Sequence, residues 1–279
     1  MEKKITIGMA SYNNPEQVWW TIQSLRMYHD LTDCEIIVID NAGNESLKNW
    51  CEAWGGELVR YISFTEKRGT AIAKEQVFVN ARGEFVVCID SHVMLSPGAI
   101  DRLKMWIGNN KGSKDLYHAP LVYDGLDCYV DHMDEVWRGG MLGIWGDAVK
   151  ELPSDPYEIP MHGMGFFGCF KDAWLHFNHE FIGFGGEEGY IHRKYKLAGH
   201  KIMCLPFVSW LHRFHDQISG TTYPNVMEER IRNYVIGWSE LGIDIKEIQD
   251  NFPGFKIELL KEHDEHGIKQ HLSILPVNT

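Results

Sequence analysis

"FVVCIDSHVML", residues 85–95, is the stretch on which the fold prediction depends. Residues 85–89 are apolar, and they are followed by Asp90, Ser91 and His92 before apolar residues resume. A short apolar run that ends in polar residues is typical of a buried strand. Residues two apart on an extended chain project to the same side, so Asp90 and His92 can reach one point. An oxygen ligand and a nitrogen ligand at a strand end suit a divalent cation such as Mn²⁺. The alternative is that Asp90 caps the next helix and that His92 only packs against its neighbours. Ser96-Pro97 already offers a cap for that helix, so Asp90 is not needed there.

The residues before this stretch alternate between strand and helix patterns. Strands are expected at 4–11, 34–41, 57–64 and 84–90, and helices are expected after Asn14, within 46–54 and over 69–81. This alternation predicts right-handed βαβ units, a mostly parallel sheet and therefore an α/β fold. Ligands of such sheets bind beyond the carboxyl ends of the strands, which is where Asp90 and His92 lie. Neither GxGxxG nor GxxxxGK[ST] is present, which disfavours a dinucleotide-binding domain and a P-loop NTPase.

Composition narrows the class of protein. The chain has 279 residues, of which 44% are hydrophobic, and this is ample for a large core. A net charge of −12 argues against non-specific nucleic-acid binding. Six cysteines without CxxC spacing read as reduced thiols. No signal peptide and no apolar segment long enough to span a bilayer is visible, so a soluble, cytoplasmic protein is expected, and a bacterial or viral origin would fit.

Motifs in both halves of the chain resemble one enzyme family. They are "SYNN", "IDN", "RGTAIAKEQ", "DSH", "WRGGMLGIW" (137–145), "MHGMGFFGCFKDAW" (161–174), "FGGEEGYIHRKYKLAGHKI" (184–202) and "FVSWLHRFH" (207–215). In this order they resemble the GT-A glycosyltransferases, in particular the catalytic domain of polypeptide N-acetylgalactosaminyltransferases and the family-2 enzymes. The resemblance implies a GT-A domain over 1–221, with a nucleotide-binding half (1–115) and an acceptor and metal half (116–221). Residues 222–279 are expected to form a small helical extension.

The resemblance also implies a divalent cation, Mn²⁺, and a UDP-sugar donor. In the family a DxD motif holds the cation; here Asp90 and His92 form a DxH variant, and His212 completes the set with His215 as a fallback. Asp40 is expected near the uracil or ribose. The donor-site residues implied by position are Ala10, Tyr12, Asp40, Arg68, Lys74, Asp90, Ser91 and Gly165. For Lys74, an ordinary exposed position on a helix is an alternative.

Glu187 and Glu188 are the candidate catalytic acids. They follow Gly185-Gly186 and precede a helical pattern, so they either complement the helix dipole or orient hydroxyls and abstract a proton. In inverting GT-A enzymes the second acid of such a pair is the base, which corresponds to Glu188. In the retaining N-acetylgalactosaminyltransferases that second position is Asn. The metal residues favour retention, and Glu188 leaves inversion open.

The resulting hypothesis is a metal-dependent glycosyltransferase that moves a sugar from a UDP-sugar to an acceptor hydroxyl on a protein, a glycan or a modified nucleobase. One alternative is an inverting family-2-like transferase with Glu188 as base. Another is a non-catalytic sugar-nucleotide binding module. A nucleotidyltransferase is disfavoured because "SYNNPEQ" lacks a glycine-rich loop with Arg and Lys. In the C-terminal part, "FKIELLKEH" is expected to be helical, and 262–271 is interpreted as a solvated helix face rather than a metal cluster.

Overall fold

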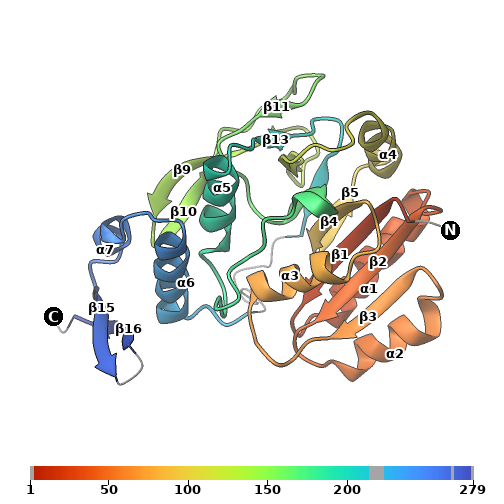
Figure 1. The fold of residues 1–279 in the computed structure, drawn as a ribbon. Coiled ribbons are helices and arrows are strands. Elements are labelled where there is room, and N and C mark those ends of the chain that lie inside the picture. The colour runs from red at the N-terminus through yellow and green to blue at the C-terminus, as the bar shows by residue number, and fades with distance from the viewer. Residues whose placement is uncertain (1–2, 214–222, 265–266, 278–279) are drawn as a thin grey trace.

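An eight-stranded sheet forms the centre of the fold (Figure 1). The computed structural model describes residues 3–213, 223–264 and 267–277. The strand order is β11-β13-β6-β12-β4-β1-β2-β3. These strands are β1 (Ile5–Ser11), β2 (Cys34–Asp40), β3 (Val59–Ser63), β4 (Phe85–Asp90), β6 (Leu116–His118), β11 (Tyr157–Glu158), β12 (Phe166–Phe170) and β13 (Ile202–Cys204). Neighbours from β4 to β3 are parallel, as are β13 and β6, whereas β12 and β11 run antiparallel to their neighbours. The two predicted halves therefore share one sheet.

Helices follow the first strands as the sequence predicts. The helices are α1 (Pro15–Tyr28), α2 (Glu45–Trp54), α3 (Thr70–Asn80), α4 (Ala99–Asn109), α5 (Glu187–Leu197), α6 (Met227–Glu240) and α7 (Lys246–Asn251), and a single 3₁₀ turn spans Lys171–Ala173. Strands β2 and β4 are buried along their apolar length, as expected for a sheet that helices cover on both faces. The predicted cap at Ser96-Pro97 is wrong. Helix α4 begins two residues later, after Gly98 in the left-handed conformation, and no side chain caps it; the backbone N–H of Ser96 donates to the carbonyl of Ser209.

A smaller sheet carries the second part of the site. It consists of β5 (Val93–Leu95), β14 (Trp210–His212), β7 (Leu121–Val122) and β8 (Tyr129–Val130). Strand β5 follows β4 after one short turn, and β14 pairs antiparallel with it so that His212 lies opposite Val93. Beyond it, β9 (Met133–Arg138) and β10 (Met141–Trp145) form a hairpin whose turn uses Gly139 and Gly140 at positive φ.

The C-terminal extension is only partly helical. After α6 and α7 the chain forms an antiparallel hairpin of β15 (Phe255–Asp264) and β16 (Gly267–Pro276), at the lower left of Figure 1. The predicted helix over "FKIELLKEH" is therefore wrong, as is the helical interpretation of 262–264 and 267–271, the described part of the predicted helix face. Apolar residues alternate at 255, 257 and 259, which is the period of a strand, and Ile257 lies opposite Ile274 in the register. Within the described residues, no helix is long and apolar enough to cross a membrane.

Candidate active site

The three predicted metal ligands converge at the carboxyl end of β4. Asp90 is the last residue of that strand, His92 follows it by two residues, and His212 ends β14. The Nε2 atoms of His92 and His212 are 3.0 Å apart, and Nε2 of His212 is 3.5 Å from Oδ2 of Asp90. One ligand atom of each residue lies within 4.8 Å of the others, and all three side chains are half-buried. A carboxylate oxygen and two imidazole nitrogens in this arrangement fit a divalent transition-metal ion.

Lys74 on α3 is the buried partner of Asp90. Only 6% of Lys74 is exposed, and its Nζ lies 3.1 Å from Oδ1 of Asp90 while it donates to the carbonyl of Met164 at 2.9 Å. Burial opposes the charge of Lys74, but Asp90 outweighs it and raises the pKa of the ammonium. Burial likewise opposes the charge of Asp90, but Lys74 and His212 hold the pKa of that carboxyl well below its usual range. Asp90 is therefore a carboxylate, and the alternative of an exposed Lys74 is wrong.

Glu187 and Glu188 begin α5 in different environments. Glu187 is 2% exposed, and its Oε1 accepts a hydrogen bond of 2.6 Å from the Thr70 hydroxyl. Its Oε2 is buried without a partner among the described residues. Glu188 is half-buried, and its carboxylate accepts no hydrogen bond from the part of the chain that is described. Burial, and then repulsion by Glu187, raise the pKa of Glu188 well above its usual range. Thr70 therefore holds the Glu187 carboxylate in place, whereas no described residue holds the Glu188 carboxylate in this way.

Asp40 shapes the loop after β2 from inside the protein. It is completely buried. Its Oδ1 accepts from the backbone N–H groups of Ala42 and Gly43, at 3.0 and 3.1 Å, and its Oδ2 accepts from the N–H of Asn44 and from the Tyr61 hydroxyl. Both oxygens are thus used within the protein, so any effect of Asp40 on a nucleotide passes through this loop. Its assignment to the donor site stays a prediction.

A stacked tyrosine pair lies at the end of β1. Tyr12 packs against Tyr223 with ring centroids 4.6 Å apart, and the Tyr223 hydroxyl donates to Oδ1 of Asn41 at 3.1 Å. The same oxygen accepts from the backbone N–H of Gly69 at 2.9 Å. Ala10 is the penultimate residue of β1. Sequence analysis did not single out Tyr223. It included Asn41 in the "IDN" motif at the end of a strand but gave it no role.

Arg68 and Ser91 occupy different surroundings. Arg68 is about one-third exposed and forms an ion pair with Glu229 of α6. Ser91 is buried; its hydroxyl accepts from the amide of Asn14, and its carbonyl accepts from the Thr21 hydroxyl at 2.9 Å. Arg68 therefore links the segment before α3 to α6 of the C-terminal extension. Ser91 fixes the turn between the candidate metal ligands Asp90 and His92 against α1.

Gly165 contacts Asp90 directly. Its carbonyl accepts a hydrogen bond of 3.0 Å from the backbone N–H of Asp90. A Cβ at this position would lie 2.5 Å from the Trp210 ring and 3.3 Å from Oδ2 of Asp90, so only glycine fits. The absence of a side chain thus lets this backbone lie directly against Asp90, one of the candidate metal ligands. The fallback ligand His215 lies outside the described residues.

Comparisons with known proteins bear on the fold and on the family resemblance. Residues 6–125 match the family model described as Glycosyl transferase family 2. The chain has a GT-A glycosyltransferase fold. It resembles a crystal structure of GalNAc-T7 with UDP, GalNAc and Mn²⁺ (TM-score 0.68, 15% identity), covering 90% of this chain and 54% of that one. It also resembles Staphylococcus aureus TarS in complex with UDP-GlcNAc (TM-score 0.57, 15% identity), covering 89% of this chain and 70% of that one.

A third structure and one curated relative extend the comparison. The mannosyltransferase PcManGT from Pyrobaculum calidifontis, in complex with GDP-Man and Mn²⁺, has a TM-score of 0.54 and 13% identity, with 90% of this chain and 70% of that one covered. The uncharacterized glycosyltransferase YfnE of Bacillus subtilis is 21% identical over 150 residues. That match covers 53% of this chain and 38% of YfnE, so the chain spans well under half of that relative. The predicted fold and resemblance are confirmed, and these likenesses support a glycosyltransferase.

Proposed function

We propose that the chain is a metal-dependent glycosyltransferase that moves a sugar from a UDP-sugar to an acceptor hydroxyl. The observation that carries this proposal is the convergence of Asp90, His92 and His212 beside a buried Lys74 at the carboxyl end of a parallel sheet. Two of the similar structures contain Mn²⁺, and two contain UDP or UDP-GlcNAc. UDP is therefore our choice of nucleotide and Mn²⁺ our choice of metal.

Asp90, His92 and His212 would hold the cation. When bound, it stabilises the negative charge that develops on the departing diphosphate. The contribution of the protein is to keep these ligands in the correct form and place. Lys74 keeps Asp90 ionised through their ion pair, and Gly165 fixes its backbone. The nucleotide would lie near the carboxyl ends of β1 and β4 and the start of α3, where the chain places Ala10, Tyr12, Arg68 and Ser91. Asp40 orders the loop after β2.

Glu188 is the proposed general base. The acceptor hydroxyl would give its proton to the Glu188 carboxylate while its oxygen forms a bond to the anomeric carbon and the bond from that carbon to the diphosphate oxygen breaks. A base works best when its pKa is near the working pH, and the pKa of Glu188 is raised in that direction. Glu187 is held by Thr70, so it would orient hydroxyls rather than exchange protons. A single displacement of this kind inverts the anomeric configuration. We therefore favour the inverting alternative over the retention that the metal residues alone suggest.

The acceptor remains within the classes named from the sequence: a hydroxyl on a protein, a glycan or a modified nucleobase. Glu188 is needed only by an enzyme that activates such a hydroxyl. A non-catalytic binding module would use the metal ligands, but it would not need a general base at Glu188. The cysteines that the structure describes are all free thiols, which fits a cytoplasmic enzyme.

The test uses Asp90→Asn and His92→Ala, with His176→Ala as the matched control. His176 is largely exposed, and among the described residues its side chain pairs only with Glu75, outside the site. Calorimetry with Mn²⁺ should show lost binding in the two site variants, and UDP release from a panel of UDP-sugars should fall by about 100-fold or more. The control should match the parent protein. Full turnover by Asp90→Asn, or by the parent protein in EDTA, would contradict the metal-dependent mechanism.

A further inference from the structure

The loop that precedes Glu187 and Glu188 consists mostly of glycines at positive φ. Gly183, Gly185 and Gly186 have φ values of +60°, +96° and +95°, and α5 starts at the next residue, Glu187. Three of the four residues in 183–186 are therefore glycines at positive φ. Glycine adopts many backbone conformations at low cost, so these residues give the loop wide backbone freedom. The loop therefore needs contacts from elsewhere if Glu187 and Glu188 are to keep one position.

Asn233 of α6 supplies those contacts through its side-chain amide. Its Oδ1 accepts from the backbone N–H of Ile182 at 3.0 Å. Its Nδ2 donates to the carbonyl of Ile182 at 2.7 Å and to the carbonyl of Gly185 at 2.9 Å. Asn233 is 1% exposed, so no water competes for these bonds. The pattern requires an acceptor and two donors on one planar group, which a carboxylate or a hydroxyl cannot offer.

The loop also lies directly against α6. A Cβ on Gly186 would be 3.0 Å from Cβ of Asn233, and a Cβ on Gly185 would be 2.8 Å from Nε of Arg230. On its other side, the Gly183 carbonyl accepts from the backbone N–H of Thr70 at 2.9 Å. The loop is thus held between α3 of the nucleotide-binding half and α6 of the C-terminal extension, and Figure 1 shows α6 alongside α5.

We propose that Asn233 is a positioning residue for Glu187 and Glu188. The proposal rests on the proposed function, because it assigns a purpose to the position of the two acids. Asn233 touches neither substrate nor reacting atoms; it fixes the backbone from which α5 begins. The C-terminal extension is on this view part of the active-site architecture and not a separate appendage.

Two variants test the proposal. Asn233→Asp keeps the acceptor and removes both donors, and Asn233→Ala removes all three bonds without burying a charge. Asn251→Asp is the matched control, because its Nδ2 makes a single bond of 2.8 Å to the Glu247 carbonyl on α7, away from the loop. Hydrogen–deuterium exchange of the peptide around 180–190 should become about tenfold faster in both Asn233 variants and stay unchanged in the control. Unchanged exchange around the loop would overturn the proposal, whatever the enzyme does.

The second readout separates positioning from stability. Calorimetry with UDP and Mn²⁺ should give an unchanged affinity in the Asn233 variants, while kcat falls by about 10- to 100-fold, since small displacements of reacting groups have effects of this size. Faster exchange with an unchanged kcat would refute a catalytic purpose. If the parent protein transfers no sugar from any donor tested, the proposed function fails, and the exchange experiment still decides whether Asn233 holds the loop.

Discussion

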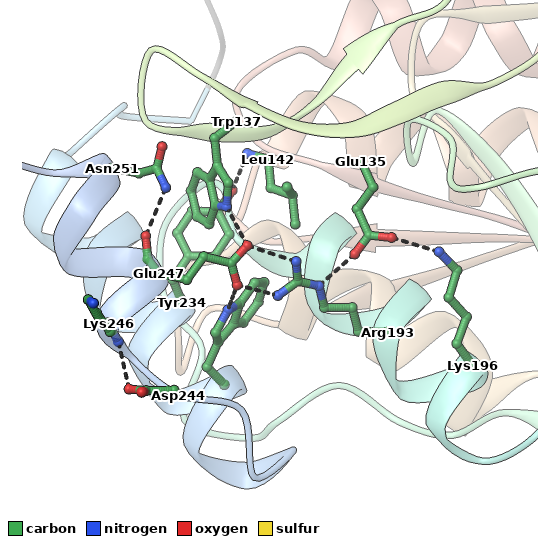
Figure 2. A network of polar contacts seen from close by, with 11 residues as sticks. Glu135, Trp137, Leu142, Arg193, Lys196, Tyr234, Asp244, Lys246, Glu247 and Asn251 are labelled. Atoms are coloured by element: carbon green, nitrogen blue, oxygen red, sulfur yellow. Dashed lines mark hydrogen bonds and ion pairs between the residues drawn. The ribbon is translucent and has the colours of Figure 1, made fainter.

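Glu247 on α7 ties the C-terminal extension to α5 and the β9–β10 hairpin, and Figure 2 shows the contacts. One of its oxygens accepts from Trp137 Nε1 at 2.7 Å and from Arg193 at 2.9 Å. The other accepts from Arg193 at 2.7 Å and from Trp238 Nε1 at 2.9 Å. Replacing Glu247 by Gln keeps the shape but removes the charge and turns one acceptor into a donor that faces other donors. We expect this substitution to destabilise the protein without touching the site.

The size of the effect follows from the carboxylate. Hydrogen bonds from Arg193 are the largest cause of the lowered pKa of Glu247, and they outweigh burial, which raises it. Hydrogen bonds from the two tryptophans lower it further, and the pKa falls from 4.5 to about 2. That difference corresponds to at most ~3.4 kcal/mol at ~1.36 kcal/mol per pKa unit. The Glu247 side chain is 32% exposed, so solvent screening reduces the expected loss to ~1.5–2 kcal/mol. For a chain of this length the melting temperature should fall by roughly 3–8 °C.

The pH dependence gives the sharper test. A carboxyl whose pKa is lowered by folding stabilises the protein above its unfolded pKa, and this contribution disappears as the pH falls toward the folded value. Urea unfolding at pH 7 should therefore show the full difference between the parent and Glu247→Gln, and the difference should shrink between about pH 5 and pH 2. Glu258→Gln is the control, because its pair with Lys256 is exposed and should contribute under ~0.5 kcal/mol. A difference at pH 7 no larger than that of the control, or one that stays constant with pH, would refute the reasoning.

Three further predictions concern the site. Glu188→Gln should leave UDP affinity unchanged and lower kcat by about 10²–10⁴-fold. In the parent protein, activity should rise as the pH passes upward through the raised pKa of Glu188, and the variant should lack this rise. A normal rate in the variant, with a product of retained configuration, would contradict this prediction. Asp40→Asn should loosen the 42–44 loop and weaken UDP binding about tenfold by calorimetry, with Mn²⁺ binding unchanged. Treatment with EDTA should weaken UDP binding at least about tenfold, and added Mn²⁺ should restore it.

The parts of the site that sequence could reveal are those encoded locally. Asp90 and His92 are two residues apart at the end of an apolar run, so strand geometry alone brings them together. His212 was found through the family resemblance and not by spacing, because only the pairing of β14 with β5 places it opposite Val93. The alternation of strands and helices in the first third was readable for the same reason: each pattern spans a few consecutive residues.

The remainder depends on contacts between distant segments. Asn233 lies about 50 residues beyond the loop that it holds, and it sits in a helix where Asn carries no special signal. The burial of Lys74 could not be read from α3, because it is produced by Asp90 and Met164 packing over it. In the C-terminal hairpin, alternating apolar residues competed with an adjacent pair of leucines at 259 and 260, which gave the segment a helical appearance.

The charges around Asp90 connect donor binding to the proposed base. Asp90, Glu187 and Glu188 lie within electrostatic reach of each other, and their nearby positive charges are Lys74 and Arg230. While Glu188 is protonated, the two remaining carboxylates balance the two positive charges, and ionisation of Glu188 adds one net negative charge, which disfavours a diphosphate. A divalent cation reverses this sign, so the nucleotide should bind with the cation or after it. Burial and Glu187 are the main reasons for the raised pKa of Glu188, but Asp90 adds to it. A cation that neutralises Asp90 should therefore lower that pKa, so that the base becomes ionised as the donor site is filled.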